Sequence, residues 1–389
     1  MKSEVILKQP EVSYKVLRVS PELPSKLIEL GATKFYRCFN CGNCTAICPL
    51  TEGKVSYPRK LIRYSLLGLE DRILSSAEPW LCYYCGECSD YCPRDAEPGS
   101  FMMALRRYLT TKYDWTGLSR LLYFSKKVEV IAIIILAAIV GLLIYFLHGP
   151  IVLDRVELET FAPIHIVDTA GLAVFFILAT LLITNIYRMY RYVMRDDQGR
   201  RIKIPLKFLI TDFIKTVPLH FFTQMKFRLC KVWNWINHLI IVYGYAAAFI
   251  LFVPLLRFTQ TNEPFLLVNP LSILGILSTI ALIYGASVAI HGRVKKSQPM
   301  WRYSHSTDWM FILLLLVTVV TGILVGIFRL IGLPLATYIT YSIHLMIVAP
   351  FLILEVPFAK WSHLAYRPFA IYFAGLKERF LASRGVMYV

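Results

Sequence analysis

Long apolar runs alternate with short polar connections over the last two thirds of the chain. An α-helix rises about 1.5 Å per residue, so about 20 apolar residues cross the hydrocarbon core of a bilayer. Runs of about that length recur near residues 130–147, 166–186, 232–256, 271–290, 310–330 and 336–358. The pattern predicts six transmembrane helices.

The first 120 residues follow a different pattern. Apolar residues recur at roughly helical spacing among basic ones in residues 57–74, and a second helical pattern covers residues 100–113. We therefore expect an all-α chain, with one helical domain over residues 1–120 and a membrane domain over residues 121–389.

Composition and charge support a membrane protein and predict its orientation. The chain is 57% hydrophobic with a mean hydropathy of +0.55, and its net charge is +17. Basic residues gather in the loop 188–231 and in residues 293–302, whereas the opposite loop 154–159 is acidic. By the positive-inside rule, both termini face the cytoplasm. The charge thus predicts topology and contact with anionic lipid, not nucleic acid.

The N-terminal segment gives the expected compartment. Residues 1–36 contain no apolar stretch of the kind that forms a cleavable signal. We therefore expect a multi-pass protein of the inner membrane of a prokaryote, with its first domain in the reducing cytoplasm.

Two cysteine runs in the first domain repeat one spacing, Cys-x-x-Cys-x-x-Cys-x-x-x-Cys-Pro, which is the signature of bacterial two-cluster ferredoxins. In such ferredoxins the cysteine before proline ligates the other cluster. Each of two [4Fe–4S] clusters is then predicted to bind four thiolates: Cys38, Cys41, Cys44 and Cys92 for the first, and Cys82, Cys85, Cys88 and Cys48 for the second. A zinc site or disulfides are the alternatives. Zinc usually takes cysteine pairs or mixtures with histidine, and cytoplasmic thiols stay reduced.

Only Cys230 remains outside these runs, and we interpret it as a spare thiol. A catalyst that acts on disulfides would need further paired cysteines. The distance between the two runs favours a helical ferredoxin domain over the compact, strand-rich kind.

Histidines in the membrane half are the candidate haem ligands. Clusters at the cytoplasmic face need an electron donor or acceptor in the bilayer, and haem iron bound by imidazoles is the usual one. His344 lies within an apolar span, where an ionisable ring is costly and therefore indicates function. Histidines at helix ends are more often interfacial anchors.

Three segments resemble the cytochrome b subunit of respiratory nitrate reductase: residues 344–363, 306–309 and 234–238. The resemblance implies an inner haem between His238 and His363, and an outer haem on His344. Where that family has a second outer histidine, this chain reads Ala-Ala-Ala-Phe at 246–249. His165, or else His148, is then the expected partner of His344. His291 and His305 are rivals at the inner site, and a single haem is the alternative.

The whole arrangement resembles the C subunit of the quinone-interacting membrane-bound oxidoreductases of sulfate reducers, which is like a fusion of the C and E subunits of heterodisulfide reductase. The resemblance covers nearly the full length. It implies two cubane clusters, two b-type haems and soluble partner subunits that carry FAD. It also implies electron flow from menaquinol toward adenylylsulfate reductase. The chain has no glycine-rich dinucleotide motif after a strand, so we expect no flavin site of its own.

Two intramembrane carboxyl groups are candidates for proton transfer with a quinone. Asp168 lies one turn from His165, and Glu355 lies eight residues before His363. Structural pairing with arginine or a backbone amide is the alternative for both.

Two other functions fit the sequence. One is a membrane anchor or transport protein with sensory or structural clusters. The other is the membrane subunit of a heterodisulfide- or sulfite-linked reductase. Residues 205–228 are expected either to lie on the inner membrane surface or to pack under the cluster domain.

Overall fold

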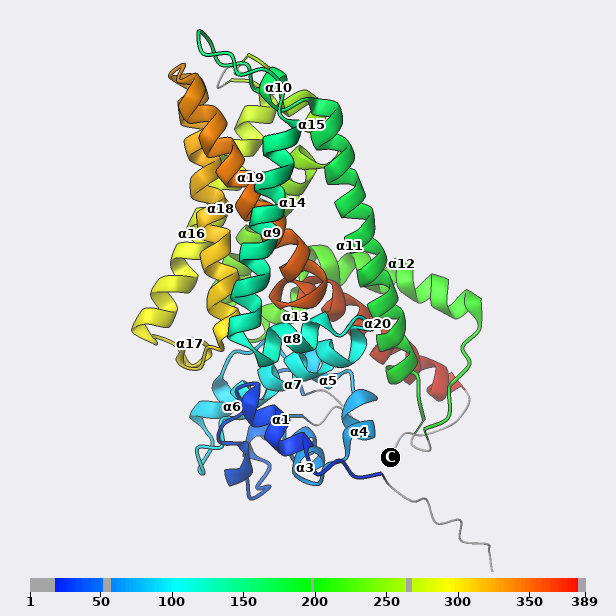
Figure 1. Ribbon diagram of the computed structural model, residues 1–389. Helices are drawn as coiled ribbons and strands as arrows, with labels where there is room; N and C mark the ends of the chain where they lie inside the picture. The colour runs from blue at the N-terminus through cyan, green and yellow to red at the C-terminus, as the bar shows by residue number, and fades with distance from the viewer. Residues whose placement is uncertain (1–17, 52–56, 197–198, 264–267, 384–389) are drawn as a thin grey trace, which may run out of the picture.

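The computed structural model of the chain describes residues 18–51, 57–196, 199–263 and 268–383. Within these ranges every named element is a helix, which confirms the predicted all-α class (Figure 1). Long helices form an upright bundle, and the short N-terminal helices gather below one end of it. Residues 1–17, part of the segment in which we expect no signal, lie outside the described residues.

Among the described residues, six helices are long and apolar enough to cross a bilayer, one for each predicted span. They are α9 (Lys126–Leu147), α11 (Ile164–Val193), α14 (Val232–Phe252), α16 (Pro270–Lys295), α18 (Ser306–Leu330) and α19 (Pro334–Phe358). The side chains of Ser125 and Asn269 cap the first turns of α9 and α16 by accepting backbone N–H groups. Because a helix satisfies its own backbone hydrogen bonds, its apolar surface is compatible with lipid. The chain is therefore a multi-pass membrane protein.

The N-terminal domain is built from short helices. They are α1 (Leu23–Glu29), α2 (Asn43–Ala46), α3 (Arg59–Leu66), α4 (Glu70–Leu74), α5 (Glu78–Leu81), α6 (Glu87–Asp90), α7 (Pro98–Tyr113) and α8 (Leu118–Phe124). The helix expected near residues 100–113 is α7. The helical pattern of residues 57–74 is divided between α3 and α4, because Gly68 has a φ of +66° and turns the chain. A Cβ at Gly68 would lie 2.6 Å from the Ser20 carbonyl oxygen, so only glycine fits.

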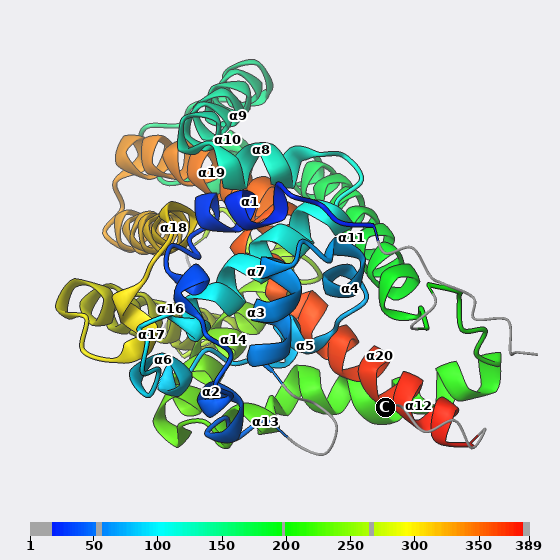
Figure 2. The ribbon, with the colours of Figure 1, turned by 90° about the horizontal axis from the view of Figure 1, so that it is seen from below.

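Two further helices extend sideways below the bundle, side by side in the view from below (Figure 2). They are α12 (Leu206–Thr223) and α20 (His363–Ser383). Tyr372 donates a hydrogen bond of 2.8 Å to the Leu209 carbonyl, and Arg379 pairs with Asp212 at 2.9 Å. The segment 205–228 therefore packs against the C-terminal helix, while Ile214 and Phe222 remain exposed on α12.

The chain between His344 and His363 differs from the single helix that the sequence suggested. Helix α19 ends at Phe358, and a 3-10 turn over Lys360–Ser362 precedes α20. Pro350 and Pro357 lie within α19, and proline weakens a helix by removing a backbone donor. The break, rather than a kink within one helix, sets the direction of His363.

One apolar core joins the N-terminal domain to the inner end of the bundle. It includes residues of α1, α3, α5 and α7, the last turns of α11, and α20. At its centre the ring of Tyr366 packs on Trp80 at 5.0 Å and on Tyr113 at 5.5 Å, between ring centroids. The cluster domain is thus fixed against the membrane helices. The remaining short helices are α10 (Leu158–Phe161) and α15 (Leu256–Thr259) at the far end, and α13 (Met225–Arg228) and α17 (Pro299–Arg302) at the near end.

Candidate functional site

The two cysteine loops have the same local conformation. Asn40 and Tyr84, at equivalent positions, have φ of +67° and +57°, and Gly42 and Gly86 have φ of +91° and +87°. Each glycine precedes a one-turn helix, α2 or α6. The left-handed residues curl the backbone so that its N–H groups point inward at sulfur: the Tyr84 N–H lies 3.3 Å from Cys82 Sγ. Such N–H···S contacts stabilise negative charge on a cluster.

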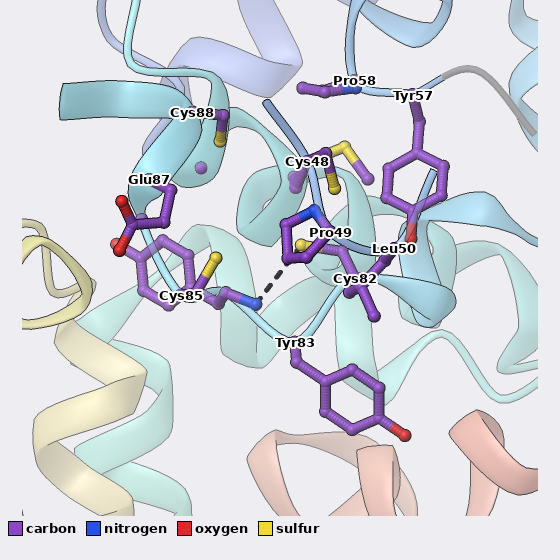
Figure 3. Close-up of a pocket in the computed structure, with 14 residues that line it drawn as sticks. Cys48, Pro49, Leu50, Tyr57, Pro58, Cys82, Tyr83, Cys85, Glu87 and Cys88 are labelled. Atoms are coloured by element: carbon purple, nitrogen blue, oxygen red, sulfur yellow. Dashed lines mark hydrogen bonds between the residues drawn. The ribbon is translucent and has the colours of Figure 1, made fainter. Parts of the chain in front are cut away.

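The structure gathers the eight cysteines into two groups of four. One hollow of about 380 Å³ is lined by Cys48, Cys82, Cys85 and Cys88 (Figure 3). The other, of about 320 Å³, is lined by Cys38, Cys41, Cys44 and Cys92. In each hollow the last cysteine comes from the other loop. This is the grouping that the ferredoxin spacing predicts; ligation itself stays a prediction.

The donor set fits a cubane cluster better than a single metal ion. Among the described residues, no three cysteine, histidine or acidic side chains converge on one point as zinc ligands do. In a cubane each iron takes one cysteine, so four thiolates surround a core rather than meet at a point. Burial raises the pKa of the Cys44 thiol to about 11 and that of Cys88 well above its usual value. Binding iron therefore has to displace protons from these thiols.

Two buried guanidinium groups lie beside the hollow of Cys82. Arg106 donates to the Pro79 carbonyl at 2.7 Å, and Arg367 donates to the carbonyls of Trp80 at 3.1 Å and Cys82 at 3.3 Å. Burial lowers the pKa of Arg106 to about 9, with Arg367 adding repulsion. Two such cations are costly to bury unless negative charge accompanies them. A cluster with four thiolates would supply that charge.

Cys230 has a more specific position than the spare thiol that we expected. Its side chain forms a hydrogen bond with that of Cys85, and this bond lowers the pKa of Cys85 to about 7. Cys230 belongs to the connection just before α14, so a thiol of the membrane half contacts the second cysteine loop. The sequence carries no signal for this contact, because Cys230 lies outside any motif.

The second cysteine loop rests on the inner end of the bundle. Arg302 of α17 pairs with Asp90 at 2.7 Å, and Lys231 lies 3.4 Å from Glu87. A Cβ on Gly86 would lie only 2.3 Å from Pro299 Cβ, so the loop and α17 are in close contact. The basic loops therefore lie at the same end as the cluster domain, and their cations pair with its acidic residues.

A buried ion network ties α7 to α18. Arg107 Nη2 lies 2.7 Å from Asp308 Oδ2, and Lys360 Nζ lies 2.5 Å from Asp308 Oδ1. Arg107 also donates to the Leu30 carbonyl at 2.8 Å. His305 caps the first turn of α18 together with Asp308, so this histidine serves helix capping here. One carboxylate thus holds a cation from each half of the chain.

A row of aromatic rings runs from the second hollow into the bundle. Tyr83 follows Cys82 directly, and in Figure 3 its ring points away from the hollow toward the C-terminal helices. Its ring stacks on Phe227 at 4.9 Å, and Phe227 packs edge-on against His238 at 5.7 Å, between centroids. The ring of His238 in turn lies 6.0 Å from that of His363. Sequence reasoning missed Tyr83 and Phe227, because the contact forms only through the fold.

His238 and His363 fit the axial positions of a haem iron. Metal–nitrogen bonds to histidine are about 2 Å long, so a 6.0 Å separation of ring centroids leaves room for one iron between them. His363 Nδ1 lies 2.5 Å from the Lys360 carbonyl oxygen, which fixes the proton on Nδ1 and leaves Nε2 free as a ligand. His238 Nδ1 is buried without a hydrogen-bond partner. Burial lowers the pKa of His363 well below its usual value and keeps it in the neutral form that metals bind.

The structure does not bring the other expected haem ligands together. His344 faces α18, with Nδ1 2.9 Å from Thr321 Oγ1. His165 is exposed on the first turn of α11, and no ring contact between the two occurs within the described ranges. His148 stacks on Phe161, and His291 is exposed near the end of α16. A second haem therefore has one positioned ligand, His344.

The two candidate carboxyl groups differ in their partners. Asp168 is buried and pairs with Arg257 at 2.8 Å, which is the structural alternative that the sequence left open. Glu355 is also buried, and its Oε2 accepts the backbone N–H of Lys360 at 2.9 Å.

Comparisons with known proteins concern the N-terminal domain. Residues 34–96 match the family model described as a 4Fe-4S dicluster domain. This part of the chain is an iron–sulfur domain. A protein of Archaeoglobus profundus that is named as like the C subunit of heterodisulfide reductase is 38% identical over 107 residues, which cover 26% of this chain and 57% of the relative. The C subunit of the H(2):CoB-CoM heterodisulfide,ferredoxin reductase of Methanothermobacter thermautotrophicus is 32% identical over 76 residues, 20% of this chain and 41% of the relative.

The iron–sulfur domain is thus similar to the C subunits of heterodisulfide reductases. The chain spans about half the length of the curated relatives it matches. No solved structure matches the chain. The matched residues 34–96 contain all eight cysteines of the two hollows, and so the comparison and the geometry concern the same site.

Proposed function

We propose that this chain is the membrane electron-transfer subunit of a quinone oxidoreductase. It passes electrons between menaquinol, b-type haem in the bundle, two [4Fe–4S] clusters and soluble flavin-containing partner subunits. The observation that carries the proposal is the row of rings from Cys82 through Tyr83 and Phe227 to His238 and His363. It connects the iron–sulfur domain to the only pair of facing histidines in the described residues.

His238 and His363 are the residues that would hold the inner haem, and bound haem supplies one-electron chemistry at that place. The chain itself keeps the site dry and neutral. Lys360 orients His363 through its carbonyl, and Phe227 covers His238. The proposal is restricted to one positioned haem, because His344 lacks a facing partner among the described residues.

The first hollow is the proposed exit toward a soluble partner. Cys41 is exposed, and the nearby Tyr36, Phe39 and Tyr91 each expose more than half of their surface. Exposed aromatic side chains are enriched at protein interfaces. The second hollow contacts the membrane helices instead. The order haem, second cluster, first cluster, partner then follows from position.

The resemblance of the whole chain to quinone-interacting oxidoreductases supports menaquinol as donor and adenylylsulfate reductase as the distant acceptor. The basic loops at the iron–sulfur end support a cytoplasmic position for that end. A second candidate is the membrane subunit of a heterodisulfide-linked reductase, which the names of the relatives favour. The two candidates share every cofactor and differ in the soluble partner.

Spectroscopy of anaerobically purified chain tests the proposal. We expect about eight non-haem iron atoms, as two cubanes require, and a b-type α-band on reduction. His238→Ala and His363→Ala should each lose the band of the inner haem. His291→Ala is the matched control, because His291 is exposed near the end of α16. Wild-type chain that contains both clusters but no haem would contradict the proposal, and co-purifying soluble subunits would decide between the two candidates.

A further inference from the structure

Two buried glutamates lie near each other at the inner end of the bundle. Glu129, in the first turn of α9, is 3% exposed, and Glu355 of α19 is 2% exposed. Helices α9 and α19 pack along one another, and the Glu129 charge acts directly on Glu355. Glu129 Oε2 is buried without a hydrogen-bond partner. Nothing in the electron route described above uses Glu129.

The cations nearby do not neutralise this pair. The Lys360 ammonium binds Asp308, which also binds Arg107, so that carboxylate is shared by two cations. Only the backbone N–H of Lys360 reaches Glu355. The other groups that face the pair are Lys126, which is exposed, and the hydroxyls of Tyr123 and Tyr245. Two carboxylates in a dry site cannot both hold a negative charge, so they retain one proton between them.

The pair is linked to the inner histidine by hydrogen bonds through one residue. Lys360 donates its N–H to Glu355, and its carbonyl accepts from His363 Nδ1 at 2.5 Å. A change of charge at the ring of His363 is therefore transmitted to Glu355 across a single residue. In a low dielectric such a coupling is strong, because water does not screen it.

We propose that Glu129 and Glu355 form a proton-exchange site on the cytoplasmic side of the membrane. The pair takes up one proton from the cytoplasm when an electron reaches the haem at His238 and His363, and returns it when the electron leaves. The inference rests on the proposed function. Glu355 and Glu129 are positioning residues for charge here and touch neither haem nor quinone.

Carboxyl labelling of the intact complex tests the shared proton. Dicyclohexylcarbodiimide modifies protonated carboxyl groups in apolar surroundings, and peptide mass spectrometry locates the adduct. At pH 7 we expect labelling of Glu355 or Glu129 in wild-type protein. In Glu129→Gln the repulsion is gone, so Glu355 ionises and its labelling falls about tenfold. Glu378→Gln, an exposed position of α20, is the control and should leave labelling unchanged.

Redox titration tests the coupling to the haem. The midpoint potential of the inner haem should fall as pH rises from 6 to 8 in wild-type protein and in Glu378→Gln. The slope should be lost in Glu129→Gln and Glu355→Gln, while the haem band stays. Unchanged slopes, or labelling of Glu355 that does not respond to Glu129→Gln, would overturn the inference and leave the proposed function intact. Absence of haem would overturn both.

Discussion

The ring of Tyr83 lies parallel to that of Phe227, with centroids 4.9 Å apart and planes inclined by 14°. Tyr83 belongs to the second cysteine loop, and Phe227 belongs to α13 of the membrane half. Arg367 covers the Tyr83 ring, with its guanidinium carbon 4.2 Å from the centroid. The stack is therefore held from both sides, and it brings the residue next to Cys82 within two ring contacts of His363.

Tyr83→Leu should slow electron transfer between the clusters and the haem without removing either. Leucine keeps the buried position apolar but cannot stack, so the protein should lose about 1 kcal/mol of stability. The measurement is the rate of haem reduction after rapid reduction of the clusters, with iron and haem contents determined in parallel. Tyr91→Leu is the control, because Tyr91 is 57% exposed. Equal rates in both variants would remove the ring stack from the electron route.

Cys48→Ser should damage the second cluster rather than the cluster of its own loop. Cys48 follows the first cysteine loop in sequence, yet it lines the hollow of Cys82, Cys85 and Cys88. The expected result is an electron paramagnetic resonance spectrum that loses the same signal as Cys82→Ser. Cys230→Ser should retain both signals, since Cys230 lies outside the two groups of four. Loss of the signal assigned to Cys38 in Cys48→Ser would show that each loop holds its own cluster.

The repeat of cysteines and the apolar runs were enough to predict the helical class and six spans, because both depend on local sequence. The grouping of Cys92 with the first loop could also be predicted, since the spacing encodes it. In the same way, the segment around His238 indicated that ring as a partner of His363 through family resemblance, and the two rings do face each other.

Features that depend on contacts between distant segments could not be predicted. Glu129 appears in the sequence as one charge at the edge of a span, and only packing of α9 on α19 places it by Glu355. Phe227 is one of many aromatic residues in a basic loop. The pairing of Asp168 with Arg257 crosses 89 positions of the chain, so no local pattern selects it.

Gly86→Ala should be more disruptive than Gly117→Ala, although both glycines have a positive φ, of +87° and +81°. A non-glycine residue in such a conformation costs about 1–3 kcal/mol. At Gly117 nothing lies within 4 Å of the added Cβ, whereas at Gly86 the Cβ would overlap Pro299. We expect both variants to unfold at lower temperature, with the larger loss in Gly86→Ala. That variant alone should also alter the signal of the second cluster, because the loop must move away from α17.

Asp308→Asn should separate the iron–sulfur domain from the bundle. Asp308 is buried and binds Arg107 and Lys360, so the neutral amide would leave two cations without a counter-charge. Removing one partner of a buried ion network costs about 3–5 kcal/mol. Asp212→Asn is the control, because its partner Arg379 is half exposed and the pair contributes less than about 1 kcal/mol. Thermal unfolding followed by the cluster absorbance would compare them. Equal midpoints would mean that the apolar core around Trp80 and Tyr366, rather than this carboxylate, holds the two parts together.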